Sequence, residues 1–212
     1  WNLSYGAVGV AANAGTIVNA ASNPFNLTGL SPNTSYDVWI RDSCGPGDVS
    51  AWAGPITIKT TCLPQSTPYF ENFDGSDFTT GTFTVPGTLN SCWIPETQVN
   101  YQWSVEDGPT TTFNAGPNAD HTTGTGKYLF SQALFGANFS QVTSTEVVTP
   151  LFDLGPLTAP EMRFWYHMYG FAMDSLAVLV NDGSGFTHVW SKSGQQQTAS
   201  ADPWLEAIVP LS

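Results

Sequence analysis

Apolar and polar residues alternate in short runs along most of the chain, and turn residues separate these runs. A period of two is typical of β-strands with one buried face, whereas an amphipathic helix repeats every three to four residues. In residues 35–41, for example, Tyr36, Val38 and Ile40 share one face. No convincing helix pattern interrupts the alternation. The sequence therefore predicts an all-β chain built from β-sandwiches.

One β-hairpin is predicted in detail. Residues 175–180 alternate, the segment 181–185 reads Asn-Asp-Gly-Ser-Gly, and the alternation resumes in residues 186–190. Asparagine, aspartate and glycine suit the positive φ angles of tight hairpin turns. We therefore expect two antiparallel strands that meet at residues 181–185.

Composition limits the classes of partner. Charged residues make up 10% of the chain, and 17 acidic residues against 5 basic ones give a net charge of −12. Nucleic acid and anionic membrane surfaces both attract basic faces, so the charge argues against either partner. It suits cations such as calcium, or solubility alone. No run of about 18 apolar residues is present, so no membrane span is predicted.

The chain has three cysteines, Cys44, Cys62 and Cys92, and no cysteine or histidine spacing typical of zinc sites. At most one internal disulfide can form, and the composition favours an extracellular setting where such a bond persists. Two prolines in residues 61–68 separate a strand from the next apolar run. This segment is predicted to be a linker between two domains.

The segment before the linker contains "LTGLSPNTSYDVWIR" at residues 27–41, followed by a "CG-G-D-S-W" pattern at residues 44–52. It resembles a fibronectin type III domain of the kind found in Bacteroidetes-type secreted proteins, over residues 1–60. Leu27 and Leu30 would plug the end of a sandwich, and the Tyr36 hydroxyl would bond to backbone at a corner. Since residues 1–5 match the third strand of that fold, the first two strands are expected to be missing.

Residues 69–212 carry a second set of motifs. In order they are "YFENFD" at 69–74, "CW" at 92–93, "DHTTGTGKYL" at 120–129, "TP" at 149–150 and "FWYHMYG" at 164–170. This series resembles the MAM domain (meprin, A5, receptor phosphatase mu). The resemblance implies a jelly-roll β-sandwich that is non-catalytic and serves adhesion. The closing strand of the family would lie beyond Ser212, so the domain is expected to be incomplete at its C-terminus.

The stretch 116–130 could be interpreted as a phosphate loop or as an Asp-His catalytic dyad, and the sequence argues against both. A phosphate loop needs a glycine five residues before Gly126 and a Ser or Thr after Lys127, but Tyr128 follows and a strand comes next. Asp120 and His121 cannot form a dyad readily, because adjacent residues of an extended chain point to opposite faces. We therefore predict no catalytic residues.

A metal site is the remaining functional interpretation of this stretch. Resemblance to calcium-binding MAM domains implies Glu71, Asp74 and Asp120 as ligands, with backbone carbonyls and water completing the shell. The alternative is that Asp120 and Thr122 only organise a turn through side-chain to backbone hydrogen bonds. Both interpretations stay open at this point.

The MAM resemblance also implies a disulfide between Cys62 and Cys92, which would contribute on the order of 3 kcal/mol by closing its loop. The alternative pairs Cys44 with Cys62. Among the aromatic residues, most tryptophans and His167 are expected to be structural. Trp39 and Trp165 fall opposite the most regular inward faces, so they are the candidates for an exposed, ligand-facing position.

The sequence thus predicts two consecutive β-sandwich modules of a secreted or cell-surface bacterial protein. Their expected work is adhesion, spacing or recognition of a surface glycan, a protein ligand or other domains of the same protein. One alternative is a carbohydrate-binding accessory of a secreted polysaccharide-degrading enzyme. The other is a non-catalytic part of a secreted peptidase, because fold alone does not assign function.

Overall fold

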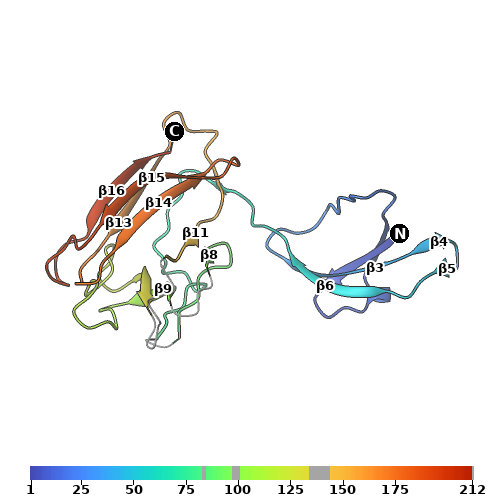
Figure 1. Cartoon of the computed structure of the whole chain (residues 1–212), viewed down its shortest axis with the longest axis horizontal. Helices are drawn as coiled ribbons and strands as arrows, with labels where there is room; N and C mark the ends of the chain where they lie inside the picture. The colour runs from blue at the N-terminus through green and yellow to red at the C-terminus, as the bar shows by residue number, and fades with distance from the viewer. Residues whose placement is uncertain (83–84, 97–100, 134–143, 212) are drawn as a thin grey trace. The chain divides into compact units, whose positions relative to one another are not determined.

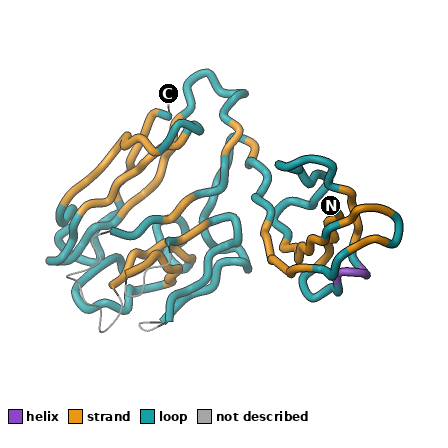
Figure 2. The backbone as a smooth tube through the Cα atoms, turned by 45° about the vertical axis from the view of Figure 1, so that its right-hand side comes forward, coloured by secondary structure: helices purple, strands orange, loops and turns teal. Residues whose placement is uncertain are grey.

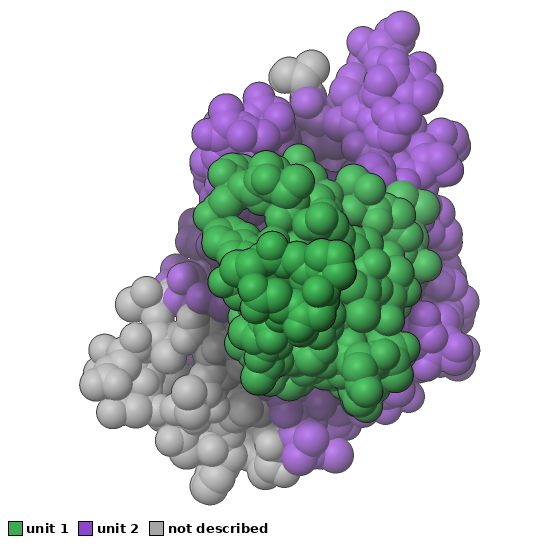
Figure 3. Space-filling model, turned by 90° about the vertical axis from the view of Figure 1, so that its right-hand side faces the viewer, with its two compact units in different colours: residues 1–63 green, residues 64–212 purple. Residues whose placement is uncertain are grey.

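The computed structural model describes residues 1–82, 85–96, 101–133 and 144–211. The chain divides into two compact units, residues 1–63 and 64–212, which are coloured separately in Figure 3. The all-β prediction is confirmed, since the helical structure in the described residues is a single 3-10 turn, η1 (Ala12–Ala14). None of the described residues forms an apolar helix long enough to cross a membrane.

Unit 1 is built on one antiparallel sheet of four strands in the order β2-β1-β3-β6 (Figure 1). The strands are β1 (Asn2–Ala7), β2 (Thr16–Asn19), β3 (Ser35–Arg41) and β6 (Ala53–Lys59), with a small hairpin of β4 (Ser43–Gly45) and β5 (Asp48–Val49). In register, Tyr5 lies opposite Val38, and Val38 lies opposite Ile56. These alternating apolar residues therefore line one face of the sheet.

The other face of this sheet is covered by the connection between β1 and β2. The backbone amide of Gly9 donates to the Asp37 carboxylate at 2.8 Å, and the Ser4 hydroxyl donates to the carbonyl of Ala12. Ser4 and Asp37 are buried beneath this connection, and Trp39, the cross-strand neighbour of Ser4, is buried on the same face. Trp39 is only 8% exposed. The prediction that Trp39 is exposed is wrong, because this connection covers the face that lies opposite the apolar one.

The apolar face of unit 1 is partly open among the described residues, with Ile56 69% exposed and Ile40 43% exposed. At one end of the sheet the backbone amide of Ser31 donates to the Tyr36 hydroxyl at 3.0 Å, which is the corner hydrogen bond expected from the sequence. The assignment of residues 1–60 to the fibronectin type III family, with two strands missing, stays a prediction.

Unit 2 consists of paired strands (Figures 1 and 2). Antiparallel pairs join β9 (Tyr101–Asp107) to β10 (Lys127–Ala133), β8 (Ile94–Pro95) to β11 (Val147–Val148), β13 (Glu161–Tyr166) to β16 (Leu205–Pro210), and β14 (Ser175–Asn181) to β15 (Phe186–Ser193). A parallel pair joins β7 (Gln65–Ser66) to β12 (Phe152–Asp153). Figures 1 and 2 show β13 to β16 running side by side.

The hairpin predicted at residues 175–190 is confirmed. Strands β14 and β15 pair around the turn 181–185, where Gly183 and Gly185 have φ angles of 102° and 129°. The Asn181 side chain accepts the amide of Gly183 at 2.8 Å. Glycine is required at these two positions, because other residues rarely adopt such angles.

The buried apolar residues of unit 2 form two clusters. The first contains Phe78, Trp93 and Val105, and the second contains Tyr166, Met168 and Ala207. In the second cluster Trp190 of β15 packs edge-on against Tyr166 of β13, with ring centroids 5.4 Å apart. Aromatic rings thus connect the β13–β16 pair to the β14–β15 pair, as expected for the inner layer of a sandwich.

Part of the predicted linker belongs to unit 2. The Gln65 amide donates to the carbonyl of Leu151 at 2.7 Å, and the Thr67 hydroxyl donates to the carbonyl of Asp153 at 2.9 Å. Prolines flank this short strand without occupying its donor positions, so pairing is possible. The boundary between the units falls inside the predicted linker, between Leu63 and Pro64.

Candidate functional site

Asp120 organises the turn that precedes β10. Its Oδ2 accepts the backbone amides of Thr122 and Thr123 at 2.8 and 2.7 Å. Its Oδ1 accepts the amide of Gly126 at 2.7 Å and the Thr123 hydroxyl at 3.1 Å. A carboxylate has about four acceptor positions, and these donors fill all of them. Burial raises the pKa of Asp120, but the hydrogen bonds outweigh it and hold the pKa below its ordinary value.

Asp74 reaches the same turn from another segment. Its Oδ1 accepts the amide of Lys127 at 2.8 Å, and its Oδ2 accepts the Asn72 side-chain amide at 2.8 Å. Asp74 and Asp120 therefore bind consecutive backbone amides. Gly126 is needed between them, because a Cβ there would lie 2.7 Å from the Asp74 carboxylate.

Glu71 faces its own segment instead. Its Oε2 accepts the Tyr69 hydroxyl at 2.8 Å, and its Oε1 accepts the amide of Phe73 at 2.9 Å. Among the described residues, Glu71 makes no hydrogen bond to the turn that Asp74 and Asp120 bind. Of the three carboxylates singled out from the sequence, the structure thus brings Asp74 and Asp120 to adjacent amides.

Lys127 and His121 have structural contacts. The Lys127 ammonium donates to the carbonyl of Phe78 at 2.7 Å, which ties the turn to a neighbouring segment. The His121 ring stacks on Trp165 with centroids 4.3 Å apart and an interplanar angle of 18°. His121 therefore faces an aromatic ring, and its described contacts do not include Asp120. This agrees with the argument that neighbouring residues diverge.

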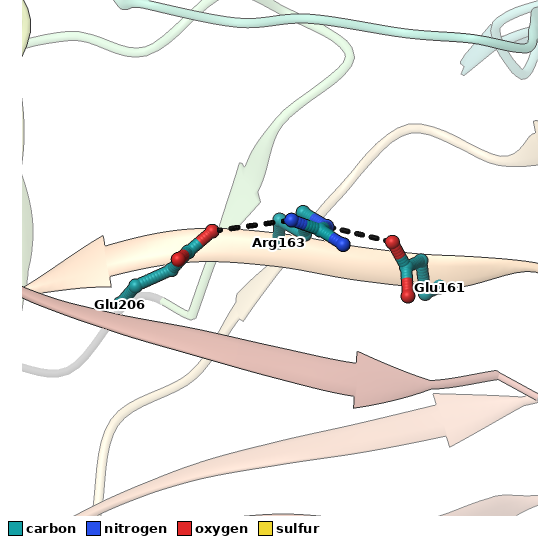
Figure 4. Close-up of polar contacts among 3 residues, drawn as sticks. All are labelled: Glu161, Arg163 and Glu206. Atoms are coloured by element: carbon teal, nitrogen blue, oxygen red, sulfur yellow. Dashed lines mark hydrogen bonds and ion pairs between the residues drawn. The ribbon is translucent and has the colours of Figure 1, made fainter.

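Trp165 lies on the outer face of β13, where it is 39% exposed. Figure 4 shows an ion-pair network on the same strand pair, in which Arg163 bonds to Glu161 at 2.6 Å and to Glu206 at 3.6 Å. Glu206 is the cross-strand neighbour of Trp165. The expectation that Trp165 is exposed is confirmed, although His121 covers part of its ring.

His167, on the segment after β13, has both ring nitrogens buried without a hydrogen-bond partner among the described residues. The expectation of a satisfied structural histidine is therefore wrong in this respect. Burial lowers the pKa of His167, and the backbone and carboxylate of Asp202 oppose that shift. The ring packs against Trp204, with centroids 5.7 Å apart.

Comparison with known proteins decides the family. The family model of the MAM domain (meprin/A5/mu) matches residues 77–212, which is more than half of the chain. The chain belongs to the MAM domain family. The MAM domain is a jelly-roll β-sandwich, which agrees with the paired strands of unit 2. No solved structure matches the chain.

The relatives of this chain are much larger proteins, and the match covers only a part of each. Neuropilin-1a of Danio rerio is 32% identical over 55% of the chain and 12% of its own length. MAM domain-containing glycosylphosphatidylinositol anchor protein 1 of Rattus norvegicus is 28% identical over 89% of the chain and 19% of its own length. The chain thus spans less than a fifth of these relatives. The MAM relatives are non-enzymatic proteins of the extracellular space or the cell surface, which is consistent with a non-catalytic module at the family level.

The disulfide of the chain agrees with the pairing that the MAM resemblance implies. Cys62 and Cys92 are disulfide-bonded, and Cys44 is free and exposed. The bond is consistent with an extracellular location. The prediction of a Cys62–Cys92 bond is confirmed, and the alternative pairing of Cys44 with Cys62 is wrong.

Calcium binding by the MAM domain stays a prediction. Asp120 has no acceptor position left, whereas Asp74 uses two of its four positions. Within the described residues no three acidic, histidine or cysteine side chains are grouped as metal ligands. A cation at this turn would therefore bind first to Asp74, and Asp120 would have to exchange hydrogen bonds for metal bonds.

Glu106 of β9 is a buried carboxylate that sequence reasoning did not single out. Its Oε1 has no hydrogen-bond partner in the part of the chain that the structure describes, and Glu106 lies opposite Tyr128 of β10 in register. Burial, and to a lesser extent the charge of Asp107, raises the pKa of Glu106. Residues 104–106 are all buried, so both faces of β9 are covered at this point. Glu106 therefore does not face solvent, as a charged residue on an alternating strand usually does.

We expect Glu106→Gln to stabilise the protein in a pH-dependent way. Because the folded pKa is raised, the folded state favours the protonated acid, and its contribution is complete below the ordinary pKa of 4.5. This contribution is lost as the pH rises through the raised folded pKa. The variant should match the wild type below pH 4.5 and exceed its free energy of unfolding by about 1–3 kcal/mol at pH 7.

Urea unfolding at several pH values measures this difference. Glu146→Gln serves as the control, because Glu146 is an exposed glutamate of the same unit and should give a difference near zero at every pH. A Glu106→Gln variant that is no more stable than the wild type at pH 7 would contradict the argument.

Proposed function

We propose that the chain is a non-catalytic recognition module that serves adhesion or spacing within a larger extracellular protein. Membership of the MAM family supports this proposal most strongly. The turn that most resembles an active site supports it further, because Asp120, His121 and Lys127 are all engaged in structural contacts. A bacterial secreted or cell-surface protein is the proposed parent, and a surface glycan, a protein ligand or neighbouring domains are the proposed partners.

Adhesion of beads coated with the intact chain tests this proposal. We expect the beads to adhere to a surface coated with a glycan or a protein ligand. Adhesion should be lost when the disulfide is reduced, because binding requires the folded chain. Hydrolysis of peptide or glycoside substrates by the purified chain would count against a non-catalytic module. Beads coated with the reduced, alkylated chain provide the matched control.

A carbohydrate-binding role is a second candidate, and the exposed ring of Trp165 favours it. Aromatic rings stack on sugars, and the charged groups of Arg163 and Glu206 lie on the same face of the strand pair. Binding to an array of glycans should then fall at least tenfold in Trp165→Ala. Trp190→Ala is the wrong control because Trp190 packs in the core, so Trp52→Ala in unit 1 is preferable.

Calcium is proposed as a stabilising ligand of the Asp74 and Asp120 turn. We expect millimolar calcium to raise the melting temperature relative to EDTA, because the cation would bind carboxylates that the folded chain holds together. Asp74→Asn should abolish the rise at a small cost in stability, because the amide oxygen can still accept the amide of Lys127 and only the exposed hydrogen bond from the Asn72 side chain is lost. A melting temperature that is identical in calcium and EDTA would refute the proposal.

A further inference from the structure

The two most exposed large apolar side chains of the described residues are phenylalanines of unit 2. Phe171 is 97% exposed and Phe113 is 87% exposed. A phenylalanine removes roughly 150–250 Å² from water when it is buried, so the isolated chain leaves a substantial apolar area uncovered. Single exposed apolar residues are common, but two on adjoining loops point to an interaction surface.

The loops that carry these residues lie side by side. The amide of Gly116 donates to the carbonyl of Tyr169 at 2.8 Å. A Cβ placed on Gly170 would lie 3.1 Å from the Cβ of Ala115, so the backbones are in close contact. The two loops, which are distant in the sequence, thus touch at Ala115 and Gly170. Ala115 is two residues from Phe113, and Gly170 is next to Phe171. We call the tips of these loops, residues 111–115 and 170–173, the phenylalanine tips.

The backbone of both loops is held by hydrogen bonds. The Thr110 hydroxyl donates to the carbonyl of Ala115, which closes the first loop. In the second loop the amide of Gly170 donates to the Gln195 side chain at 3.3 Å, and the amide of Met168 donates to the Gln197 side chain at 2.7 Å. The two phenylalanines are therefore presented by braced loops.

Charge selects the kind of surface that fits. Residues 108–119 contain no charged side chain, and residues 164–173 contain only the buried His167. The ends of these segments carry three carboxylates, Asp107, Asp120 and Asp174, and one cation, Arg163, which is paired with Glu161. An uncharged tip can enter an apolar layer without dehydrating a charge. The flanking carboxylates and the net charge of −12 oppose an anionic lipid surface, so a zwitterionic surface, which carries no net charge, fits better.

Area decides between a lipid surface and a protein partner. Two phenylalanines supply roughly 300–500 Å², whereas a stable protein interface needs about 800 Å² on each side. Lipid insertion has no such threshold, because affinity accumulates with each buried apolar group and with each additional copy.

We propose that Phe113 and Phe171 insert into the interfacial layer of a zwitterionic, phosphatidylcholine-type membrane. The inference deepens the proposed function, on which it rests, by naming the partner of the module. Insertion of two side chains is weak for one copy, so it becomes strong only when many copies face the same membrane.

Beads coupled through the exposed Cys44 supply the required multivalency, and phosphatidylcholine vesicles are the probe. We expect wild-type beads to capture vesicles and the lipid concentration for half-capture to rise about tenfold for each phenylalanine changed, in Phe113→Ser and Phe171→Ser. Phe70→Ser is the matched control, since Phe70 is 71% exposed elsewhere on unit 2, and it should leave capture unchanged. Vesicles with added phosphatidylserine should be captured less well.

A second measurement covers the case of a variant that misfolds. An environment-sensitive dye on Ala172→Cys, in a Cys44→Ser background, should shift to the blue when phosphatidylcholine vesicles are added. Absence of vesicle capture by the wild type, equal loss in Phe70→Ser, or no dye shift overturns the inference. If the wild-type beads fail to capture vesicles but adhere to glycan or protein surfaces, the proposed function stands and the lipid partner alone is refuted.

Discussion

We expect Asp120→Ala to lower the free energy of unfolding of unit 2 by about 3–5 kcal/mol, the largest effect of any single substitution proposed for this chain. The substitution leaves three backbone amides and one hydroxyl without an acceptor at a turn where the carboxylate itself is only 8% exposed. Hydrogen bonds to a charged group contribute more than neutral ones, and these donors are partly buried, so water replaces the lost acceptor incompletely. Denaturant unfolding followed by tryptophan fluorescence measures the loss.

Asp182→Ala is the matched control for this substitution. Asp182 also accepts a backbone amide and a hydroxyl, both from Ser184, but in an exposed hairpin turn. Its replacement should cost no more than about 1 kcal/mol, because water can take over as the acceptor. Similar losses of unfolding free energy in both variants would show that the hydrogen bonds of Asp120 contribute no more than those of an exposed turn.

The second large effect is expected from the disulfide. Changing Cys62 and Cys92 to serine together should lower the free energy of unfolding by about 3–4 kcal/mol, because the bond closes a loop of about 30 residues in the unfolded chain. A thermal melt of the double variant against the wild type measures the loss, and reduction of the wild type should reproduce it.

Cys44→Ser is the control for the disulfide variant. Cys44 is free and exposed, so its replacement should change the stability by less than about 0.5 kcal/mol. A destabilisation by Cys44→Ser as large as that of the double variant would argue that the thiol at position 44 forms a bond in solution.

Local patterns were sufficient to predict much of the fold. The hairpin at residues 175–190 follows from alternation and from the glycines of its turn, because both signals act within a few residues. The corner hydrogen bond of Tyr36 follows from a spacing of five residues. The identity of the MAM domain follows from motifs that keep their order along 140 or so residues.

Packing across the chain explains the predictions that failed. Trp39 is buried on the sheet face that it shares with Ser4 and Asp37, where the distant connection between β1 and β2 packs, and nothing in residues 35–41 encodes that cover. Glu106 is buried because both faces of β9 are covered, against the usual alternation. For the candidate site, sequence reasoning identified Asp120 and the turn, but the donors that fill its oxygens depend on the folded path of residues 122–126.

The short parallel strand β7 and the disulfide also determine how this module would carry a mechanical load. A pull on the chain from the N-terminal side reaches Cys62 and passes through the covalent bond directly to Cys92. The intervening residues, including the pairing of Gln65 with Phe152, are then shielded from tension. Reduction of the bond would release roughly 100 Å of additional chain, since an extended residue spans about 3.5 Å. The disulfide thus sets the extensibility of the module under force.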